Sequence, residues 1–278
     1  MNYRHVFHAG NFVDVMKHAA LALVIEHLKG KEQPFCVLDT HAGIGRYDLW
    51  SEPAQRTGEF RDGILKVIRD PLAELTPYLD VVRAMNGGGP HVRWYPGSPG
   101  LAQALLRPQD RLVLCELHPE DAKTLAASFA DDARVQAQEA DGYIGLKALL
   151  PPKERRGCVL IDPPFEVTDE FERIVRGLGH AHRRWATGIY IVWYPIKHRG
   201  PIQVFHEALK GSGIRRILVA ELLLRADTDP DQLNGSGLVI VNPPWRLEES
   251  ISRLLPALLA DFGASGTGRV RVKTLVAE

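Results

Sequence analysis

The sequence predicts an α/β fold with a mainly parallel sheet, one antiparallel strand and helices on both faces of the sheet. Short apolar runs recur along the chain, and four of them end in a polar or acidic residue. Helical stretches separate these runs, and strands that are apolar on both faces are typical of parallel sheets covered on both sides. The length of 278 residues and the hydrophobic content of 45% fit one large globular domain, which we take as residues 1–278.

The expected elements alternate along the chain. Residues 11–29 are expected to form a helix, because their apolar side chains recur with a period of about 3.6 residues, and Gly30 ends it. Strands are expected at 35–39, 112–116, 135–138, 159–162 and 188–194, the last ending at Pro195, and then near 215–224, 237–242 and 269–276. Helices are expected at 119–130, 142–150, 201–211 and 246–262.

A long insertion interrupts the first strand–helix–strand unit. In a nucleotide-binding unit, an acidic residue follows the glycine-rich turn by about 20 residues. Here the distance from Gly45 to Glu116 is 116 − 45 = 71 residues. We therefore predict a small inserted helical subdomain at about 52–95, on the ligand-binding side, where insertions commonly form lids or substrate platforms.

The composition limits the possible classes of function. Lys and Arg number 34, Asp and Glu also number 34, and the formal net charge is +0, which excludes a uniformly basic surface for nucleic acid. Short basic stretches such as "HAHRRW" at 180–185 are most simply solvated surface. No apolar run reaches the roughly 18 residues of a membrane span, and we expect no targeting signal. Cys36, Cys115 and Cys158 lie in separate apolar runs as buried thiols, which fits a cytoplasmic protein.

Acidic residues end three of the expected parallel strands. They are Asp39, Glu116 and Asp162. Since the carboxyl ends of parallel strands meet at one edge of a sheet, and ligands bind beyond that edge, these acids indicate a binding site.

The turn "LDTHAGIGRY" at 38–47 and Glu116 indicate a nucleoside ligand. Glycines such as Gly43 let the backbone approach a ligand closely, and a carboxylate at the end of the second strand accepts hydrogen bonds from ribose hydroxyls. Such an acid disfavours NADP but leaves NAD and S-adenosylmethionine open. In "ADGY" at 140–143, Asp141 either accepts a hydrogen bond from an adenine amino group or caps the helix that follows.

The stretch "IDPPF" at 161–165 indicates methyl transfer to an amino group. Adenine N6 is a poor nucleophile because its lone pair is delocalised into the ring. The Asp162 carboxylate and the Pro163 carbonyl could accept its two hydrogens, and the stiff prolines would hold both acceptors in place. Phe165 could stack on a base that has left its helix or loop.

A second stretch, "VNPPW" at 241–245, has nearly the same form. The loop before its strand is too short for a crossover helix, so a hairpin is expected and the strand should run antiparallel. Its end would then point away from the ligand edge. We therefore predict a structural role for Asn242–Trp245, with a proline in the first helical turn and Trp245 anchoring that helix.

Together these stretches resemble the RlmJ family of bacterial 23S ribosomal RNA adenine-N6 methyltransferases. The resemblance covers nearly the whole chain and is most specific at the N-terminus. It rests on "YRHVFHAGNFVDVMKH" (3–18), "LDTHAGIGRY" (38–47), "YPGSP" (95–99), "ELHP" (116–119), "ADGY" (140–143), "IDPPF" (161–165), "WYP" (193–195) and "NPPW" (242–245).

The resemblance implies a Rossmann-like class I methyltransferase that uses S-adenosylmethionine to methylate N6 of one adenine in 23S ribosomal RNA. It implies a protein-free RNA or an early assembly intermediate as the partner, and we expect a monomer. Carried over to this chain, the resemblance implies that the cofactor is contacted by Lys17, His18, His41 and Ser98. It also implies that Glu116 holds the ribose, that Asp141 and Gly142 meet the cofactor adenine, that Asp162 is the catalytic acid and that Tyr3 meets the RNA. The glycine-rich turn itself adds Asp39 and Gly43 to the expected cofactor site. The family usually has tyrosine where this chain has Phe165, so stacking is retained but a hydroxyl is lost.

Other functions compete with this one. The same acid–Pro–Pro–aromatic device serves DNA adenine and protein glutamine methyltransferases. A non-catalytic nucleic-acid-binding protein of DNA utilisation is a second alternative, although the set of acids at the strand ends argues against it. A nicotinamide dehydrogenase would leave "DPPF" without a role. His5, His8 and His18 lack the cysteine or carboxylate spacing of a zinc site, so no metal is expected.

Overall fold

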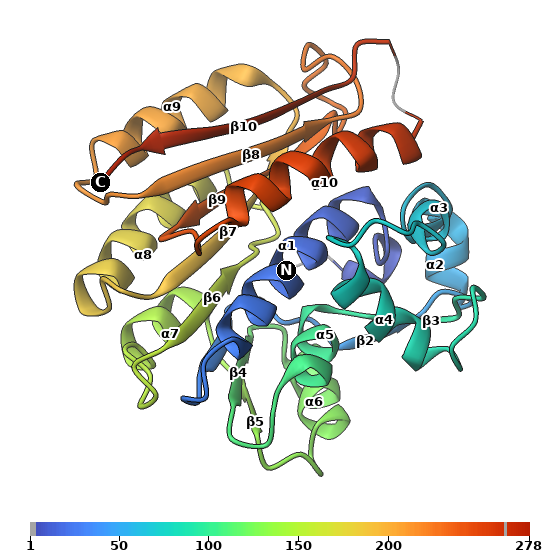
Figure 1. Ribbon diagram of the computed structural model, residues 1–278, viewed down its shortest axis with the longest axis horizontal. Helices are drawn as coiled ribbons and strands as arrows, with labels where there is room; N and C mark the ends of the chain where they lie inside the picture. Colours follow the sequence, from blue (N-terminus) through green and yellow to red (C-terminus); the bar gives the residue numbers. More distant parts are fainter. Residues whose placement is uncertain (1–3, 264–265) are drawn as a thin grey trace.

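A mixed sheet forms the centre of the molecule (Figure 1). The structure is a computed structural model that describes residues 4–263 and 266–278. Across the sheet the strands are β10 (Arg269–Val276), β8 (Ile217–Leu223), β9 (Gly235–Val241), β7 (Ile189–Ile196), β6 (Gly157–Ile161), β1 (Cys36–Asp39), β4 (Arg111–Glu116) and β5 (Val135–Glu139).

The five strands from β5 to β7 pair in parallel. Taken in chain order they are arranged 3-2-1-4-5, the doubly wound order of Rossmann-like folds. The order reverses between β1 and β6, and ligands bind at such a reversal, beyond the carboxyl ends of the strands. β9 runs antiparallel to β7 and β8, which confirms the predicted hairpin. β10 also runs antiparallel, against β8, so a second strand joins the one expected.

Helices cover both faces of the sheet, as the apolar strands indicated. Alternate strand residues point to opposite faces, so Val37 and Leu38 of β1 belong to different hydrophobic clusters. The first cluster includes side chains of α1 (Phe12–Lys29), α5 (Ser98–Leu105), α6 (Pro119–Ser128) and α10 (Leu247–Asp261). The second includes side chains of α7 (Gly142–Ala148), α8 (Glu170–Arg184) and α9 (Arg199–Lys210).

The insertion lies between the glycine-rich turn and its crossover helix α5. It begins and ends in a small antiparallel ribbon that the sequence did not predict, in which Tyr47 pairs with Tyr95. This position explains the spacing of 71 residues between Gly45 and Glu116. The segment contains β2 (Arg46–Asp48), α2 (Glu52–Thr57), η2 (Glu59–Asp62), α3 (Ile64–Val67), α4 (Thr76–Met85) and β3 (Trp94–Pro96).

Helix α1 passes between the sheet and the insertion and is buried along most of its length. The Asn11 side chain caps it by accepting a hydrogen bond from the Asp14 N–H at 3.0 Å, and Gly30 follows its last residue, as predicted. Short 3-10 helix η1 (His5–Phe7) precedes it. Burial extends to the charged side chains of Asp14 and Lys17, which need partners within the protein.

Three details of the sequence prediction are wrong. β7 continues through Pro195 to Ile196. Its pairing with β6 stops at Val192, so the proline lies where the strand has a neighbour on one side only and its missing N–H is tolerated. Trp245 does not anchor α10, since it is 76% exposed.

The prolines of "NPPW" also precede the helix instead of lying in its first turn. α10 begins at Leu247, after Arg246 in the left-handed conformation, and buried Leu247 and Ile251 hold it against the sheet. Asn242 does have the predicted structural role. Its amide donates to the carbonyls of Ala186 and Gly188, both at 2.8 Å, at the amino end of β7 and therefore opposite the predicted site.

Cys36, Cys115 and Cys158 are buried and unpaired on three separate strands, as predicted. Within the described ranges, no helix combines the length and the apolar character that crossing a membrane would require.

Candidate active site

A cavity of about 470 Å³ opens at the carboxyl ends of β1, β4 and β6, where the strand order reverses. It brings together most of the residues predicted from the sequence. Lining it are Lys17, His18, His41, Gly43, Ser98, Glu116, Asp141, Gly142, Asp162, Pro163 and Phe165. Asp39 lies beneath the cavity rather than in its wall, and Tyr3 lies outside the described residues.

The glycine-rich turn is hydrogen-bonded to Glu116. Glu116 accepts a hydrogen bond from the Gly43 N–H through Oε2 and one from the His118 N–H through Oε1, both at 2.8 Å. Gly43 has φ +62, and a Cβ there would lie 2.3 Å from the Tyr47 hydroxyl, so only glycine fits. Each carboxylate oxygen keeps a second lone pair, so Glu116 can still accept from the hydroxyls of a ligand.

Asp141 caps α7, which is the structural alternative that the sequence left open. Its Oδ1 accepts from the N–H groups of Tyr143 and Ile144 at 2.8 and 3.1 Å. Its Oδ2 lies 3.6 Å from the Arg173 guanidinium, and Asp141 is one of the residues that line the cavity. Gly142 packs against β1 so closely that a Cβ would meet the Thr40 carbonyl at 2.2 Å.

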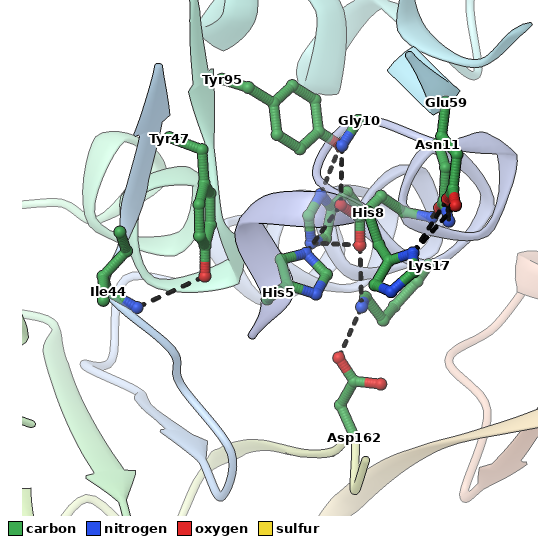
Figure 2. Close-up of polar contacts among 12 residues, drawn as sticks. His5, His8, Gly10, Asn11, Lys17, Ile44, Tyr47, Glu59, Tyr95 and Asp162 are labelled. Carbon is green, nitrogen blue, oxygen red and sulfur yellow. Dashed lines mark hydrogen bonds and ion pairs between the residues drawn. The ribbon is translucent and has the colours of Figure 1, made fainter. Parts of the chain in front are cut away.

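A chain of buried charges leads from α1 to the DPPF loop (Figure 2). The Lys17 ammonium donates to Asp162 Oδ2 at 2.5 Å and lies 3.0 Å from Asp14 Oδ1. Burial opposes its charge, but Asp162 and Asp14 together raise the pKa of Lys17 above its usual range. Lys17 is therefore a cation that holds one oxygen of Asp162 and leaves the other facing the cavity.

Aromatic side chains line the cavity beside Asp162. The Phe165 ring makes edge contacts with Phe171 and Trp193, with centroids 5.0 and 5.6 Å apart. Trp193 Nε1 donates to Ser236 Oγ at 3.1 Å, which fixes the indole. Phe165 has φ +52, an uncommon conformation for a residue with a side chain, and it directs the end of the loop toward this aromatic wall.

The remaining residues predicted at the cofactor are His18, His41, Ser98 and Asp39. Burial lowers the pKa of His18 to about 3 and that of His41 to about 4, so both rings are neutral at pH 7. His18 Nδ1 lies 2.8 Å from the Tyr95 hydroxyl, and Ser98 begins α5. Burial raises the pKa of Asp39 to about 7, and this carboxyl accepts from the His41 N–H at 3.2 Å. Asp39 thus supports the turn from below.

Sequence reasoning gave no site role to several polar and aromatic residues of the cavity, among them Asp14, His5, Arg173 and Trp193. His5 Nε2 contacts Asp14 Oδ2 at 2.9 Å (Figure 2 labels His5). The sequence does contain a signal for Asp14. It precedes Lys17 by three residues and His18 by four, and residues at these spacings lie on the same face of a helix. Arg173 and Trp193 carry no such local signal. Among the described residues, no group of three or more His, Cys, Asp or Glu is placed to hold a metal ion.

Comparison with known proteins assigns the family. Residues 32–276 match the family described as "Ribosomal RNA large subunit methyltransferase D, RlmJ". The chain is 46% identical to "Ribosomal RNA large subunit methyltransferase J" of Escherichia coli (strain K12), and 42% identical to the protein of that name from Haemophilus influenzae. Each of these matches covers 100% of both chains. A crystal structure of a Legionella pneumophila protein, 34% identical, superposes with a TM-score of 0.88 over 96% of this chain and 98% of that one. This chain therefore belongs to the RlmJ family of ribosomal RNA large subunit methyltransferases.

Proposed function

We propose that this protein transfers a methyl group from S-adenosylmethionine to N6 of a specific adenine in 23S ribosomal RNA. The observation that carries the proposal is the DPPF loop. It brings the Asp162 side chain, which Lys17 holds, the Pro163 backbone and the Phe165 ring to one cavity at the sheet reversal. RNA is the acceptor that the names of the relatives support.

The opposite wall of the cavity has the donors and acceptors that a nucleoside needs. Glu116 has lone pairs for ribose hydroxyls, and Asp141 Oδ2 lies at the cavity side of α7. Leu117, which is 50% exposed, offers an apolar surface for a purine ring. Gly43, Gly142, His41 and Ser98 would complete this half of the site, with Lys17, His18 and Asp162 between the two ligands. These residues fit S-adenosylmethionine, which when bound supplies an electrophilic methyl group.

The chain's own contribution is positioning and electrostatic stabilisation. The free oxygen of Asp162 would accept one hydrogen of the adenine amino group, and the Pro163 carbonyl would accept the other. Both acceptors localise the lone pair on N6 and stabilise the positive charge that develops there as the new bond forms. Phe165 and Trp193 would enclose the flipped base, which offsets part of the cost of unstacking it. After transfer, the extra proton leaves N6 to solvent.

The inserted segment at about 52–95 forms part of this proposal. We treat it as a small subdomain that braces α1, because Tyr78 of α4 and Tyr95 of β3 hydrogen-bond each other at 3.0 Å beside His18. A cytoplasmic monomer acting on protein-free 23S RNA or on an early assembly intermediate remains our expectation.

The test is transfer of labelled methyl from S-adenosylmethionine to protein-free 23S RNA, with wild type beside Asp162→Ala. We expect label in N6-methyladenine with wild type only. DNA and peptide acceptors are included in the same assay. Label in either of them but not in RNA would replace the proposed substrate, and failure to bind S-adenosylmethionine in calorimetry would reject the enzyme altogether.

A further inference from the structure

Asp14 is a fully buried acid on α1, one turn before Lys17, and no step above uses it. Its Oδ2 accepts from the Gly10 N–H and contacts His5 Nε2, both at 2.9 Å. Its Oδ1 lies 3.0 Å from the Lys17 ammonium. Burial raises the pKa of Asp14, but His5 and Lys17 outweigh this effect and hold the pKa well below its usual range. Asp14 is therefore a carboxylate with 0% of its side chain exposed.

Asp14, Lys17 and Asp162 form a line of alternating charge. Lys17 lies between the two acids, at 3.0 Å from one and 2.5 Å from the other, and its side chain is only 3% exposed. Lys17 and Asp162 alone would sum to zero charge. With Asp14 the three groups sum to −1 when the His5 ring, 2.9 Å from Asp14 Oδ2, is neutral, in a region where water screens little.

This sum of charges bears on the reaction. Positive charge develops on the attacking amino nitrogen, beside Asp162, as the methyl group is transferred. The Lys17 ammonium orients Asp162 but its own charge opposes that development. A second carboxylate behind Lys17 offsets the opposing charge without occupying any space in the cavity.

We propose that Asp14 is a positioning residue that balances the charge of Lys17, so that Asp162 presents a net negative site to the substrate amine. The inference rests on the proposed methyl transfer and assigns a role to a residue that touches neither ligand. It is distinct from the structural role that the Gly10 and His5 contacts give Asp14, which is to tie the N-terminal segment to α1.

Asp14→Asn separates the two roles. The amide keeps the volume and an oxygen that can accept from Gly10, but it loses the charge. We expect kcat to fall about 100-fold, on the order of the loss of one preorganised electrostatic contact. The KM for RNA and the Kd for S-adenosylmethionine should stay within about threefold of wild type, because no ligand contact changes.

The matched control is Asp110→Asn. Asp110 is another buried acid, and it binds the Phe35 N–H and Arg107 at the amino end of β4, on the edge of the sheet away from the cavity. This variant should lower the melting temperature and leave kcat unchanged. A loss of kcat in both variants would make the effect of Asp14 one of stability and would overturn the proposal.

A double-mutant cycle with Lys17→Met adds a test that a structural role would not pass. Once Lys17 is neutral there is no charge to balance, so Asp14→Asn should change single-turnover rates by less than about threefold in that background. Fully multiplicative losses would contradict the proposal. If the Lys17→Met rate is too low to measure, the test is the Asp14→Asn single variant. A lower kcat with an unchanged KM supports the proposal, and an unchanged kcat contradicts it.

The wild-type reaction distinguishes this inference from the proposed function. If wild type methylates RNA and folded Asp14→Asn is equally active, only the role of Asp14 is lost. If wild type binds S-adenosylmethionine but transfers nothing to RNA, the proposed function fails and this inference fails with it.

Discussion

The DPPF and NPPW loops share a sequence pattern and differ in almost every structural property. The first follows β6, which runs parallel to its neighbours and ends at the cavity. The second follows β9, which runs antiparallel and ends at the opposite edge of the sheet. Asp162 accepts a hydrogen bond from Lys17 and lines the cavity, whereas the Asn242 amide donates to two backbone carbonyls. The direction of the preceding strand, and not the motif, decides which loop can be catalytic.

The aromatic residues of the two loops differ in the same way. Phe165 packs against Phe171 and Trp193 inside the cavity wall. Trp245 is 76% exposed, with the Arg246 guanidinium 4.3 Å from its ring centroid. A flat ring after two prolines therefore has a defined binding geometry only when other rings surround it.

The largest expected difference is between the two polar residues. Asp162→Asn should lower kcat by about 1,000-fold or more, because it removes the negative charge that faces the amino group and the ionic partner of the buried Lys17. Methyl transfer under saturating substrates measures this, and circular dichroism checks the fold. If folded Asp162→Asn kept at least about a tenth of wild-type activity, the claim that DPPF is the catalytic loop would be contradicted.

The aromatic residues should show a smaller difference. Phe165→Ala should lower kcat/KM for RNA by about 10- to 100-fold, the loss expected for one base-stacking contact. Phe165→Tyr should stay within about threefold, since the ring is retained. Trp245→Ala is the matched control, and we expect wild-type kinetics from it.

Asn242→Ala should affect stability instead of rate. The part-buried Gly188 carbonyl would lose its donor, which costs about 1–3 kcal/mol of unfolding free energy, and the exposed Ala186 carbonyl would turn to water at little cost. Urea unfolding measures the loss, and kcat of the folded fraction should be unchanged. A catalytic defect in folded protein would give NPPW a role in the reaction.

The smallest expected effect concerns Asp39, the acid beneath the cavity. Its folded pKa of about 7 lies above the unfolded value, so its stabilising contribution is complete below about pH 4 and is lost as the pH rises through 7. Asp39→Asn should therefore raise the melting temperature at pH 8 more than at pH 5, relative to wild type. An equal shift at both pH values would contradict the raised pKa of Asp39.

The sequence predicted the positions of those residues whose place in the fold follows from the local pattern of strands and turns. Apolar runs followed by acids located Asp39, Glu116 and Asp162, because parallel strands must bring their carboxyl ends together. The hairpin logic placed Asn242 away from the cavity, because a short loop reverses the chain.

Tertiary packing decided the rest. The charge of Asp14 could not be connected to Asp162 from sequence, since 145 residues separate Lys17 from Asp162 and the contact depends on how α1 crosses the sheet. β2 and β3 are only three residues long, too short for a strand pattern to show. The exposure of Trp245 depends on where α10 begins, and boundaries are the least predictable feature of a helix.

The most direct test of the account is mass spectrometry of N6-methyladenine in protein-free 23S RNA incubated with S-adenosylmethionine and three proteins, wild type, Asp162→Ala and Asn242→Ala. We predict a new methylated adenine with wild type and Asn242→Ala, and none with Asp162→Ala. Methylation by Asp162→Ala, or its loss only in a folded Asn242→Ala, would show that the reaction does not take place at the end of β6.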